Sequence, residues 1–361
     1  MSNTSKKTTK KNSPILLDFE DNALLPELFG EHDRHLALIE EGLEVTLSSR
    51  GNRVSVEGTV EAGHLANSVL RMLYTRLKDG LPVGLGDVDG AIRLAQSNAR
   101  GGSEMASGKN GYAIHTKRRT ITPRSLHQSQ YIEQIRDNQL VFSVGPAGTG
   151  KTYLAVAMAV AMLLDCSVER LILSRPAVEA GESIGFLPGD MREKVDPYLR
   201  PLYDALHDML PDDQVEKLLL NGTIEVAPLG FMRGRTLSNA FIILDEAQNT
   251  TPMQMKMFLT RLGENSRMII AGDPSQVDLP DGARSGLYDA IDILGNVDGI
   301  ALVRFGESDV VRHPLVSKMV QAYNARDDRR EEARKARIAA YAQEKAKSAA
   351  EDTPPTDDSA A

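Results

Sequence analysis

Short apolar runs alternate with helical patterns along the chain from about Thr122 onward. The runs LVFSV, RLILS, TIEVAP, AFIILD, RMIIAGD and GIALVRF are apolar at most positions, and KTYLAVAMAVAMLL between the first two is typical of a buried helix. A strand without alternating polar positions is buried on both faces, as in a parallel sheet covered by helices on both sides. The pattern therefore predicts an α/β fold with such a sheet over residues 121–323.

A different pattern precedes this region. In RHLALIEE and EAGHLANSVLRMLYTRLKDG the apolar residues recur at helical spacing, and the second stretch ends in a glycine stop. Between them, LEVTLSS and RVSVEG alternate like two strands and are joined by SSRGN, which suits a hairpin turn. We expect a small α+β module within residues 14–96.

Three polar stretches separate or flank these parts. Residues 1–13 are rich in Lys, Ser and Thr and are expected to be disordered, and residues 97–120 are expected to form a glycine-rich linker. Residues 324–361 begin as a charged helix and end as a disordered acidic tail. The basic end of the linker, HTKRRT, is either a solvated charge run or a contact for nucleic-acid phosphates.

Composition narrows the possible partners and compartments. The 361-residue chain has a net charge of -8, which argues against electrostatic capture by nucleic acid over its whole surface but allows a local basic patch. No apolar run reaches the roughly 18 residues of a membrane span, so no membrane is expected. A single cysteine cannot form an internal disulfide and suits the reducing cytoplasm. The seven histidines form no metal-like cluster, which argues against structural zinc.

The stretch GPAGTGKT fits the phosphate-loop pattern G-x-x-x-x-G-K-[ST] and lies between an apolar strand and an apolar helix. Its glycines let several backbone N–H groups face one anion, and the helix that follows adds the positive end of its dipole. Lys151 is expected to contact the β- and γ-phosphates of a nucleotide, and the Thr152 hydroxyl to bind Mg²⁺. The predicted nucleotide-binding residues of this loop are Gly145, Pro146, Ala147, Gly148, Thr149, Gly150, Lys151 and Thr152.

Two further apolar strands end in polar residues that suit a hydrolytic site. AFIILDEAQN places Asp245 and Glu246 at the carboxyl end of a buried strand, the edge where open α/β sheets bind ligands. Asp245 is expected to hold Mg²⁺, and Glu246 to orient or deprotonate an attacking water. In RMIIAGDPSQVDLP, Gln276 closely follows the next strand and is expected to sense the γ-phosphate or the lytic water. These residues predict an enzyme that hydrolyses its nucleotide.

Together, GPAGTGKT, LDEAQN and GDPSQVDLP resemble the core of superfamily 1 helicases. The blocks SRPAVEAGESIGFLPGDMREKVDPYLRPLYDAL and SDVVRHPLV resemble the PhoH family of phosphate-starvation-inducible ATPases, a likeness that extends from about Thr122 to Tyr323. The resemblance implies a cytoplasmic, RecA-like P-loop NTPase that uses ATP and Mg²⁺ and acts in RNA metabolism. It also implies that a glutamine in ITPRSLHQSQYIEQI reads adenine. Gln128 is the first choice and Gln130 the second, and either also suits a helix cap or a surface position.

Several arginines are candidates for contacts with phosphates or nucleic acid. The region of Arg175 touches the nucleic-acid backbone in helicases, but an arginine at a sheet edge equally suits a salt bridge. Arg233 and Arg235 are assigned to phosphate or RNA contacts. Arg312 is predicted to be the arginine finger at the γ-phosphate, the alternative being a pairing or capping role on a surface helix. Because too few residues follow Tyr323 for a second RecA-like domain, this finger is expected from a neighbouring subunit of a homo-oligomeric ring.

The small N-terminal module resembles a KH-like RNA-binding fold. A KH domain grips four nucleotides with a G-x-x-G loop, whereas the equivalent LFGEHDRHLALIEE holds only Gly30 and is acidic. RNA binding and a packing or assembly role are therefore both open for the module.

These features predict a PhoH-like ATPase whose hydrolysis is coupled to RNA remodelling or unwinding. The main alternative is an ATP-gated adaptor that recruits a ribonuclease or a ribosome-associated partner without unwinding. A small-molecule kinase is disfavoured, because a hydrolytic Glu246 would consume ATP without phosphotransfer.

Overall fold

The computed structural model describes residues 14–99, 112–176, 191–280 and 283–311, together with single residues between 315 and 329. Residues up to Val311 form one compact unit, and Arg312–Ala361 form a second one. Three of the predictions fall outside the described residues: disorder over residues 1–13, most of the charged helix and tail over 324–361, and the arginine finger Arg312.

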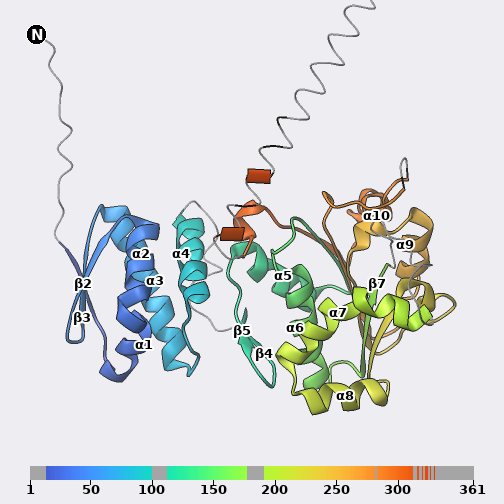
Figure 1. Ribbon diagram of the computed structural model, residues 1–361, viewed down its shortest axis with the longest axis horizontal. Helices are drawn as coiled ribbons and strands as arrows, with labels where there is room; N and C mark the ends of the chain where they lie inside the picture. The colour runs from blue at the N-terminus through green and yellow to red at the C-terminus, as the bar shows by residue number, and fades with distance from the viewer. Residues whose placement is uncertain are drawn as a thin grey trace, which may run out of the picture. The chain divides into compact units, whose positions relative to one another are not determined.

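Six parallel strands form the central sheet of the described chain (Figure 1). They are β6 (Leu140–Val144), β7 (Arg170–Arg175), β8 (Ile224–Pro228), β9 (Ala240–Leu244), β10 (Arg267–Gly272) and β11 (Ile300–Arg304). Their order in the sheet is β11-β6-β10-β9-β7-β8, and every neighbouring pair runs parallel. Each strand coincides with one of the apolar runs, so the predicted α/β fold with a parallel sheet is confirmed.

Helices cover both faces of this sheet, as the unbroken apolar strands require (Figure 1). One face packs against α5 (Leu126–Asp137), α6 (Lys151–Leu164), α7 (Met191–Met209) and α8 (Asp212–Leu220) in one buried apolar cluster. The other face packs against α9 (Pro252–Leu259) and α10 (Gly286–Leu294) in a second cluster. All residues of β6 and β9 are buried, so these strands lie in the middle of the core. None of the described helices combines the length and apolar character needed to cross a bilayer.

The strand order brings three strand ends together. β10 pairs with β6 on one side and with β9 on the other, so the carboxyl ends of these strands are neighbours. The phosphate-loop sequence follows β6, Asp245 follows β9, and Asp273 follows β10. Ligands of open α/β sheets bind at this edge, and the arrangement agrees with the RecA-like fold that the resemblance implied.

The N-terminal module contains a three-stranded antiparallel sheet and four α-helices. Its strands β1 (Ile15–Asp18), β2 (Thr46–Arg50) and β3 (Arg53–Glu57) lie in the order β1-β3-β2. Its helices are α1 (Leu25–Phe29), α2 (Arg34–Leu43), α3 (Val60–Lys78) and α4 (Leu85–Ala99). The predicted helix, hairpin and second helix are present as α2, β2–β3 and α3. Strand β1 does not show the alternation of apolar and polar residues that marks a half-buried strand. Three of its four residues are apolar, although only Leu17 is buried.

Part of the stretch predicted as a linker over residues 97–120 is ordered. Helix α4 continues to Ala99, and β4 (Ile114–His115) and β5 (Thr120–Ile121) form a short antiparallel hairpin. Ile114 and Ile121 are buried in the same apolar cluster as α6. One buried isoleucine within a polar, glycine-rich stretch and one directly after it are too few for a strand pattern, so this hairpin depends on its packing against the core.

Candidate nucleotide site

The phosphate-loop sequence forms a tight turn between β6 and α6. Gly145 has a φ of 148°, and a Cβ atom there would lie 2.5 Å from the backbone oxygen of Phe305, so this close approach excludes any side chain. Gly150 has a φ of 85°, in the left-handed region, and directly precedes α6. The loop therefore ends at a helix N-terminus, where backbone N–H groups and the helix dipole favour an anion.

Lys151, the first residue of α6, is folded against this loop. Its side chain is buried, and Nζ donates hydrogen bonds to the backbone oxygens of Gly145 at 2.6 Å and Pro146 at 2.8 Å. An ammonium is a compact charge on a flexible stem. It can therefore turn from these carbonyl oxygens to phosphate oxygens without a change of the backbone.

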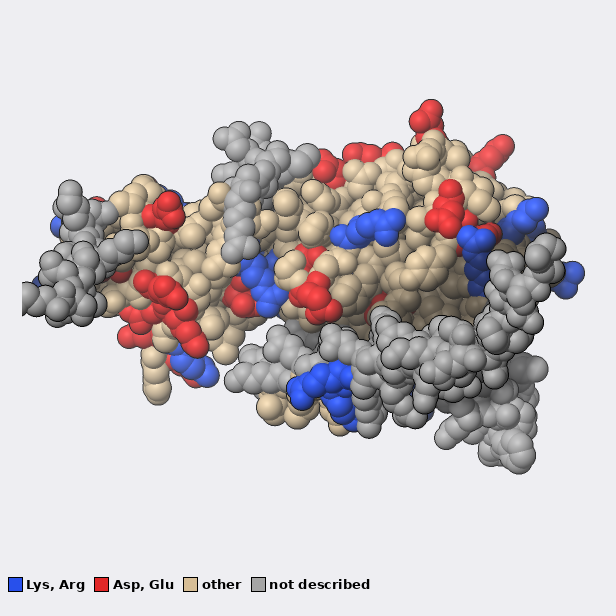
Figure 2. Space-filling view, turned by 90° about the horizontal axis from the view of Figure 1, so that it is seen from above, with Lys and Arg blue, Asp and Glu red and all other residues tan. Residues whose placement is uncertain are grey.

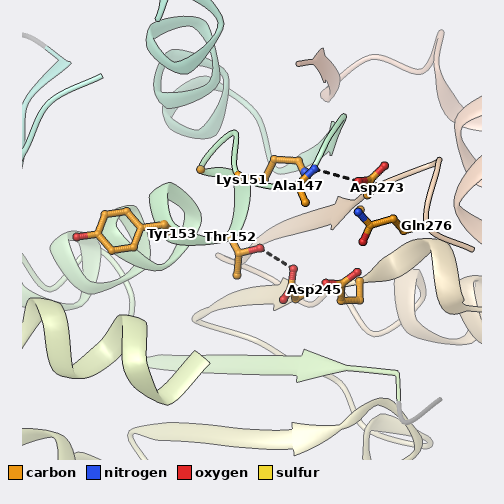
Figure 3. Close-up of a pocket in the computed structure, with 11 residues that line it drawn as sticks. Ala147, Lys151, Thr152, Tyr153, Asp245, Asp273 and Gln276 are labelled. Carbon is orange, nitrogen blue, oxygen red and sulfur yellow. Dashed lines mark hydrogen bonds between the residues drawn. The ribbon is translucent and has the colours of Figure 1, made fainter. Parts of the chain in front are cut away.

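Thr152 and Asp245 meet across the site. The Thr152 hydroxyl donates to Asp245 Oδ1 at 2.5 Å, which joins the start of α6 to the residue after β9 (Figure 3). Asp245 is 7% exposed, and burial, followed by the neighbouring charge of Glu246, raises the pKa of its carboxyl. The hydrogen bond from Thr152 opposes this shift in pKa. A buried acid in this setting gains from a nearby cation, which compensates the charge that burial disfavours.

These two oxygen ligands fit a magnesium ion. Mg²⁺ is usually bound by one or two carboxylates together with substrate phosphates and waters, and dedicated all-protein cages are uncommon. One buried carboxylate and one hydroxyl beside a phosphate loop meet that requirement. Across the described part of the chain, no group of three or more His, Cys, Asp or Glu side chains is arranged to hold a metal ion.

Glu246 combines a strained backbone with two polar partners. Its φ of 51° and ψ of 38° lie in the left-handed region, where a non-glycine residue is strained by about 1–3 kcal/mol. The Arg175 guanidinium, at the end of β7, lies 3.1 Å from Oε1, and Gln248 Nε2 lies 2.5 Å from Oε2. Such strain persists where the surroundings hold it in place, and it concentrates at functional sites. The carboxylate is thus held at the sheet edge beside Asp245.

Gln248 connects the three strand ends, a role that we did not assign from the sequence. It is fully buried, its Oε1 accepts a hydrogen bond from Asp273 N at 3.0 Å, and its Nε2 donates to Gln276 O at 3.0 Å. Asp273 in turn accepts a hydrogen bond from Ala147 N of the phosphate loop at 2.9 Å. Hydrogen bonds therefore run continuously from Glu246 to the phosphate loop. The available signal was the position of this glutamine in LDEAQN, two residues after Glu246.

The phosphate loop and the acid pair line one small pocket. It has a volume of about 240 Å³ and lies between the phosphate loop and the residues that follow β9 and β10 (Figure 3). The structure brings eight of the predicted site residues together here: Ala147, Gly148, Gly150, Lys151, Thr152, Asp245, Glu246 and Gln276. They come from three strand ends and the first turn of one helix, so the sheet order is what assembles them.

The two candidate adenine-reading glutamines have different surroundings. Gln128 is buried, its Nε2 donates to Thr149 O at 2.9 Å, and its Oε1 accepts from Arg124 N at 2.6 Å. Both ends of its amide are therefore engaged with backbone groups, one of them in the phosphate loop. Gln130 lines a separate cavity beside β11. Adenine recognition by Gln128 stays a prediction.

Two of the candidate nucleic-acid arginines form internal ion pairs. Arg175 contacts Glu246, which is the salt bridge at the sheet edge that we considered as its alternative role. Arg235 forms a bidentate pair with Glu225, at 2.6 Å and 2.7 Å. Arg233 is exposed at the end of the 3-10 helix that follows β8.

The basic run HTKRRT also contacts acidic residues. Arg118 lies 3.2 Å from Asp212, and Arg119 lies 3.2 Å from Asp208. Both acids are near the junction of α7 and α8. The two arginines therefore help to dock the β4–β5 hairpin on the core.

Residues 120–324 match the sequence profile of a family described as PhoH-like protein. A PhoH-like protein of Bacillus subtilis is 49% identical over 308 residues, covering 84% of this chain and 94% of that protein. A PhoH-like protein of Mycobacterium tuberculosis is 48% identical over 301 residues, covering 83% of this chain and 85% of that protein. Protein PhoH of Escherichia coli is 46% identical over 206 residues, covering 56% of this chain and 58% of that protein.

Among solved structures, the Sulfolobus solfataricus SWI2/SNF2 ATPase core in complex with dsDNA aligns with a TM-score of 0.34 at 13% sequence identity. The alignment covers 54% of this chain and 46% of that one, a similarity too low to support a conclusion. The sequence matches are far stronger, and the family profile spans the whole sheet that carries the phosphate loop. The chain therefore belongs to the PhoH-like protein family.

Proposed function

We propose that this PhoH-like protein binds ATP with Mg²⁺ in the phosphate-loop pocket and hydrolyses it. One observation carries the proposal: Lys151, Thr152 and the acid pair Asp245 and Glu246 line a single pocket of about 240 Å³. A cation for the phosphates, oxygen ligands for a metal and a carboxylate beside them are the groups that triphosphate hydrolysis requires.

Each group has a distinct proposed role. Backbone N–H groups of the loop and Lys151 compensate the charge of the phosphates, as preorganised donors do in other enzymes. Thr152 and Asp245 hold Mg²⁺, which neutralises charge on the phosphate oxygens. Glu246, oriented by Arg175 and Gln248, is the general base that accepts a proton from water. Gln276 lines the same pocket and is the proposed sensor of the γ-phosphate.

We further infer that hydrolysis is coupled to RNA remodelling or unwinding in the cytoplasm. The resemblance to helicase cores supports this, and so does the location of Arg175 at the sheet edge beside the proposed base. A nucleic acid that engaged Arg175 would compete with the contact between Arg175 and Glu246. Substrate binding and orientation of the base would then be linked.

An ATP-gated adaptor for a ribonuclease or ribosome-associated partner is the second candidate. On the face shown in Figure 2, the described Lys and Arg side chains are interspersed with Asp and Glu. Arg118, Arg119 and Arg235 form internal ion pairs, and the net charge of the chain is -8. A mixed surface of this kind gives little long-range attraction for RNA, which favours a protein partner.

A homo-oligomeric ring with Arg312 acting in trans is a further part of the proposal. Mixing Lys151→Ala subunits with Arg312→Ala subunits tests it, because a mixed ring contains some interfaces with an intact loop and an intact finger. ATPase activity should return at intermediate ratios. If no ratio regains activity, the trans arrangement is wrong.

The proposed function is tested by the ATPase rate with and without single-stranded RNA, measured alongside the molar mass in solution. Magnesium-dependent phosphate release that RNA stimulates, with strand displacement that tracks turnover, supports RNA remodelling. RNA-independent turnover with tight ribonuclease binding supports the adaptor. Failure to bind ATP in every assembly state would refute both.

A further inference from the structure

A second, larger cavity adjoins the triphosphate pocket. Its volume is about 1050 Å³, and it shares Gly148, Gly150 and Tyr153 with the smaller pocket. In Figure 3 the Tyr153 ring points away from Asp245 and Gln276. The smaller pocket, at about 240 Å³, is below the roughly 300–1000 Å³ of pockets that take a whole drug-sized ligand. A nucleotide whose phosphates fill it needs further room for its base and ribose.

The N-terminal module supplies one wall of this larger cavity. Leu81, Pro82 and Gly84, in the connection between α3 and α4, line it on that side. The remaining wall comes from the core: the β4–β5 hairpin, Gln128 of α5 and Leu154 of α6. Module and core belong to the same compact unit, so both walls of the cavity lie within that unit.

The lining suits a purine nucleoside. Pro82 and Leu154 offer apolar contacts, and Tyr153 offers an aromatic ring. The two faces of a flat base can therefore pack against these side chains. Arg76 and Arg124 also line the cavity. An arginine both stacks on planar rings and donates several hydrogen bonds, which suits base edges and ribose oxygens.

Charged contacts hold the module's wall against the core. Asp87 of α4 lies 3.5 Å from Arg76 and 3.8 Å from Arg124, so one carboxylate faces two guanidinium groups. Arg76 also donates to Thr122 Oγ1, directly after β5, at 2.6 Å. The side chains of Arg76 and Asp87 are 16% and 18% exposed, so salt screens this pair only weakly. Because two guanidinium groups face one carboxylate, a net positive charge remains here, and it complements the negative charge of a nucleotide.

A second contact joins the module to the phosphate loop. Arg93 of α4 donates to the backbone oxygens of Val310 at 2.7 Å and Ser308 at 3.1 Å. Val311, the next residue, donates its N–H to Gly148 O of the loop at 2.9 Å. The module therefore forms one wall of the larger cavity and is connected to the phosphate loop through residues 308–311.

We propose that the adenosine half of ATP binds in this larger cavity, between the ATPase core and the N-terminal module. The inference rests on the proposed binding of the triphosphate in the smaller pocket. It assigns the module a function other than gripping RNA: the module closes the base and ribose subsite. Nucleotide binding and the position of the module are then linked, because the nucleoside contacts both walls.

Gly84→Phe in the full chain tests the proposal by filling the cavity. A Cβ atom at Gly84 would meet Asp87 Oδ2 at 3.7 Å and no other neighbour within 4 Å, so the position accepts a side chain. Affinities for ATP, ADP and inorganic tripolyphosphate are measured by calorimetry. The Kd of ATP and ADP should rise by at least about tenfold, the scale of one lost base-stacking contact, while the Kd of tripolyphosphate stays within about twofold.

Gly230→Phe is the matched control. Gly230 lies in the 3-10 helix Leu229–Met232, lines neither cavity, and has nothing within 4 Å of an added Cβ atom. This variant should bind all three ligands as the wild type does. A second measurement uses the wild type alone: photocrosslinking with 8-azido-ATP should label peptides containing residues 76–87 or 116–124.

Three outcomes would overturn the inference. Unchanged ATP affinity in Gly84→Phe, equal losses for ATP and tripolyphosphate, or crosslinks confined to other peptides would each place the nucleoside elsewhere. If Gly84→Phe loses binding of an RNA oligonucleotide but keeps its affinity for ATP, the cavity binds nucleic acid and the inference is wrong. A wild type that binds neither tripolyphosphate nor ATP would instead refute the proposed function itself, so the two failures are distinguishable.

Discussion

Glu246→Gln should remove most ATP turnover while leaving ATP binding intact. The substitution keeps the size of the side chain but removes its ability to accept a proton from water. Loss of a positioned general base lowers the rate by about 10²–10⁴-fold, equivalent to about 3–5 kcal/mol in the activation barrier. The Kd of ATP should change by less than about threefold, because the phosphate loop, Lys151 and Asp245 keep their contacts.

Glu246→Gln should also lower the stability of the folded protein, because the Glu246 carboxylate has two hydrogen-bond donors. Arg175 donates to Oε1 at 3.1 Å and Gln248 to Oε2 at 2.5 Å, so the carboxylate accepts from two donors. A glutamine side chain offers one oxygen, and one of the two donors therefore loses its acceptor. Because Gln248 is fully buried, we expect a loss of about 1–2 kcal/mol in the free energy of unfolding, or a few degrees in Tm.

Single-turnover phosphate release measures the chemical step, and titration with a fluorescent nucleotide measures binding. Glu225→Gln is the matched control, since Glu225 forms a bidentate pair with Arg235 away from the pocket. The control should be destabilised by a similar amount and keep its turnover. If Glu246→Gln binds ATP and turns over within about tenfold of the wild-type rate, another group accepts the proton and the assignment of Glu246 is refuted.

Three other substitutions test the geometry of the site. Burial, and then the charge of Glu246, raise the pKa of Asp245, so the folded protein favours the protonated acid and is destabilised when Asp245 ionises. Asp245→Asn should therefore raise the Tm of the nucleotide-free protein near neutral pH. This increase in Tm should shrink as the pH falls through the raised pKa toward about 4. An increase in Tm that grows on acidification would contradict this explanation. Gln248→Ala leaves the buried N–H of Asp273 without its acceptor and should cost about 1–3 kcal/mol in urea unfolding, whereas an unchanged midpoint would show that the bond contributes little. Gly145→Ala would place a Cβ atom 2.5 Å from Phe305 O and should weaken ATP binding by more than about tenfold in the same titration; wild-type affinity would show that the loop can move aside.

The hydrogen bonds around Gln248 give these predictions a common basis. Gln248 contacts Glu246, Gln276 and Asp273, and Asp273 contacts Ala147. Because buried hydrogen-bonded groups constrain one another, a shift of the phosphate loop changes the surroundings of the proposed base. Substitutions of Gln248 or Asp273, which connect the network to the phosphate loop, should therefore affect ATP affinity and turnover together, while Glu246→Gln affects mainly turnover.

Local sequence determined the class of fold and the centre of the site. A strand covered on both faces must be apolar along its length, so β6 and β9 are visible as short apolar runs. A phosphate loop needs glycines, Lys151 and Thr152 at set spacing, and acids at a strand end mark the ligand edge of a sheet. Each of these requirements acts within a few consecutive residues, which is why the sequence alone reveals it.

Only the tertiary structure decided which side chains meet across the fold. Arg175 contacts Glu246, Asp273 contacts Ala147, and Arg76 contacts Thr122, yet each pair is separated by tens of residues along the chain. The β4–β5 hairpin and the wall that the N-terminal module adds to the larger cavity likewise depend on packing between distant segments. A hydrogen bond or ion pair between distant residues imposes no periodicity on either segment. Such contacts therefore leave no local pattern and are fixed when the sheet, the loops and the module come together.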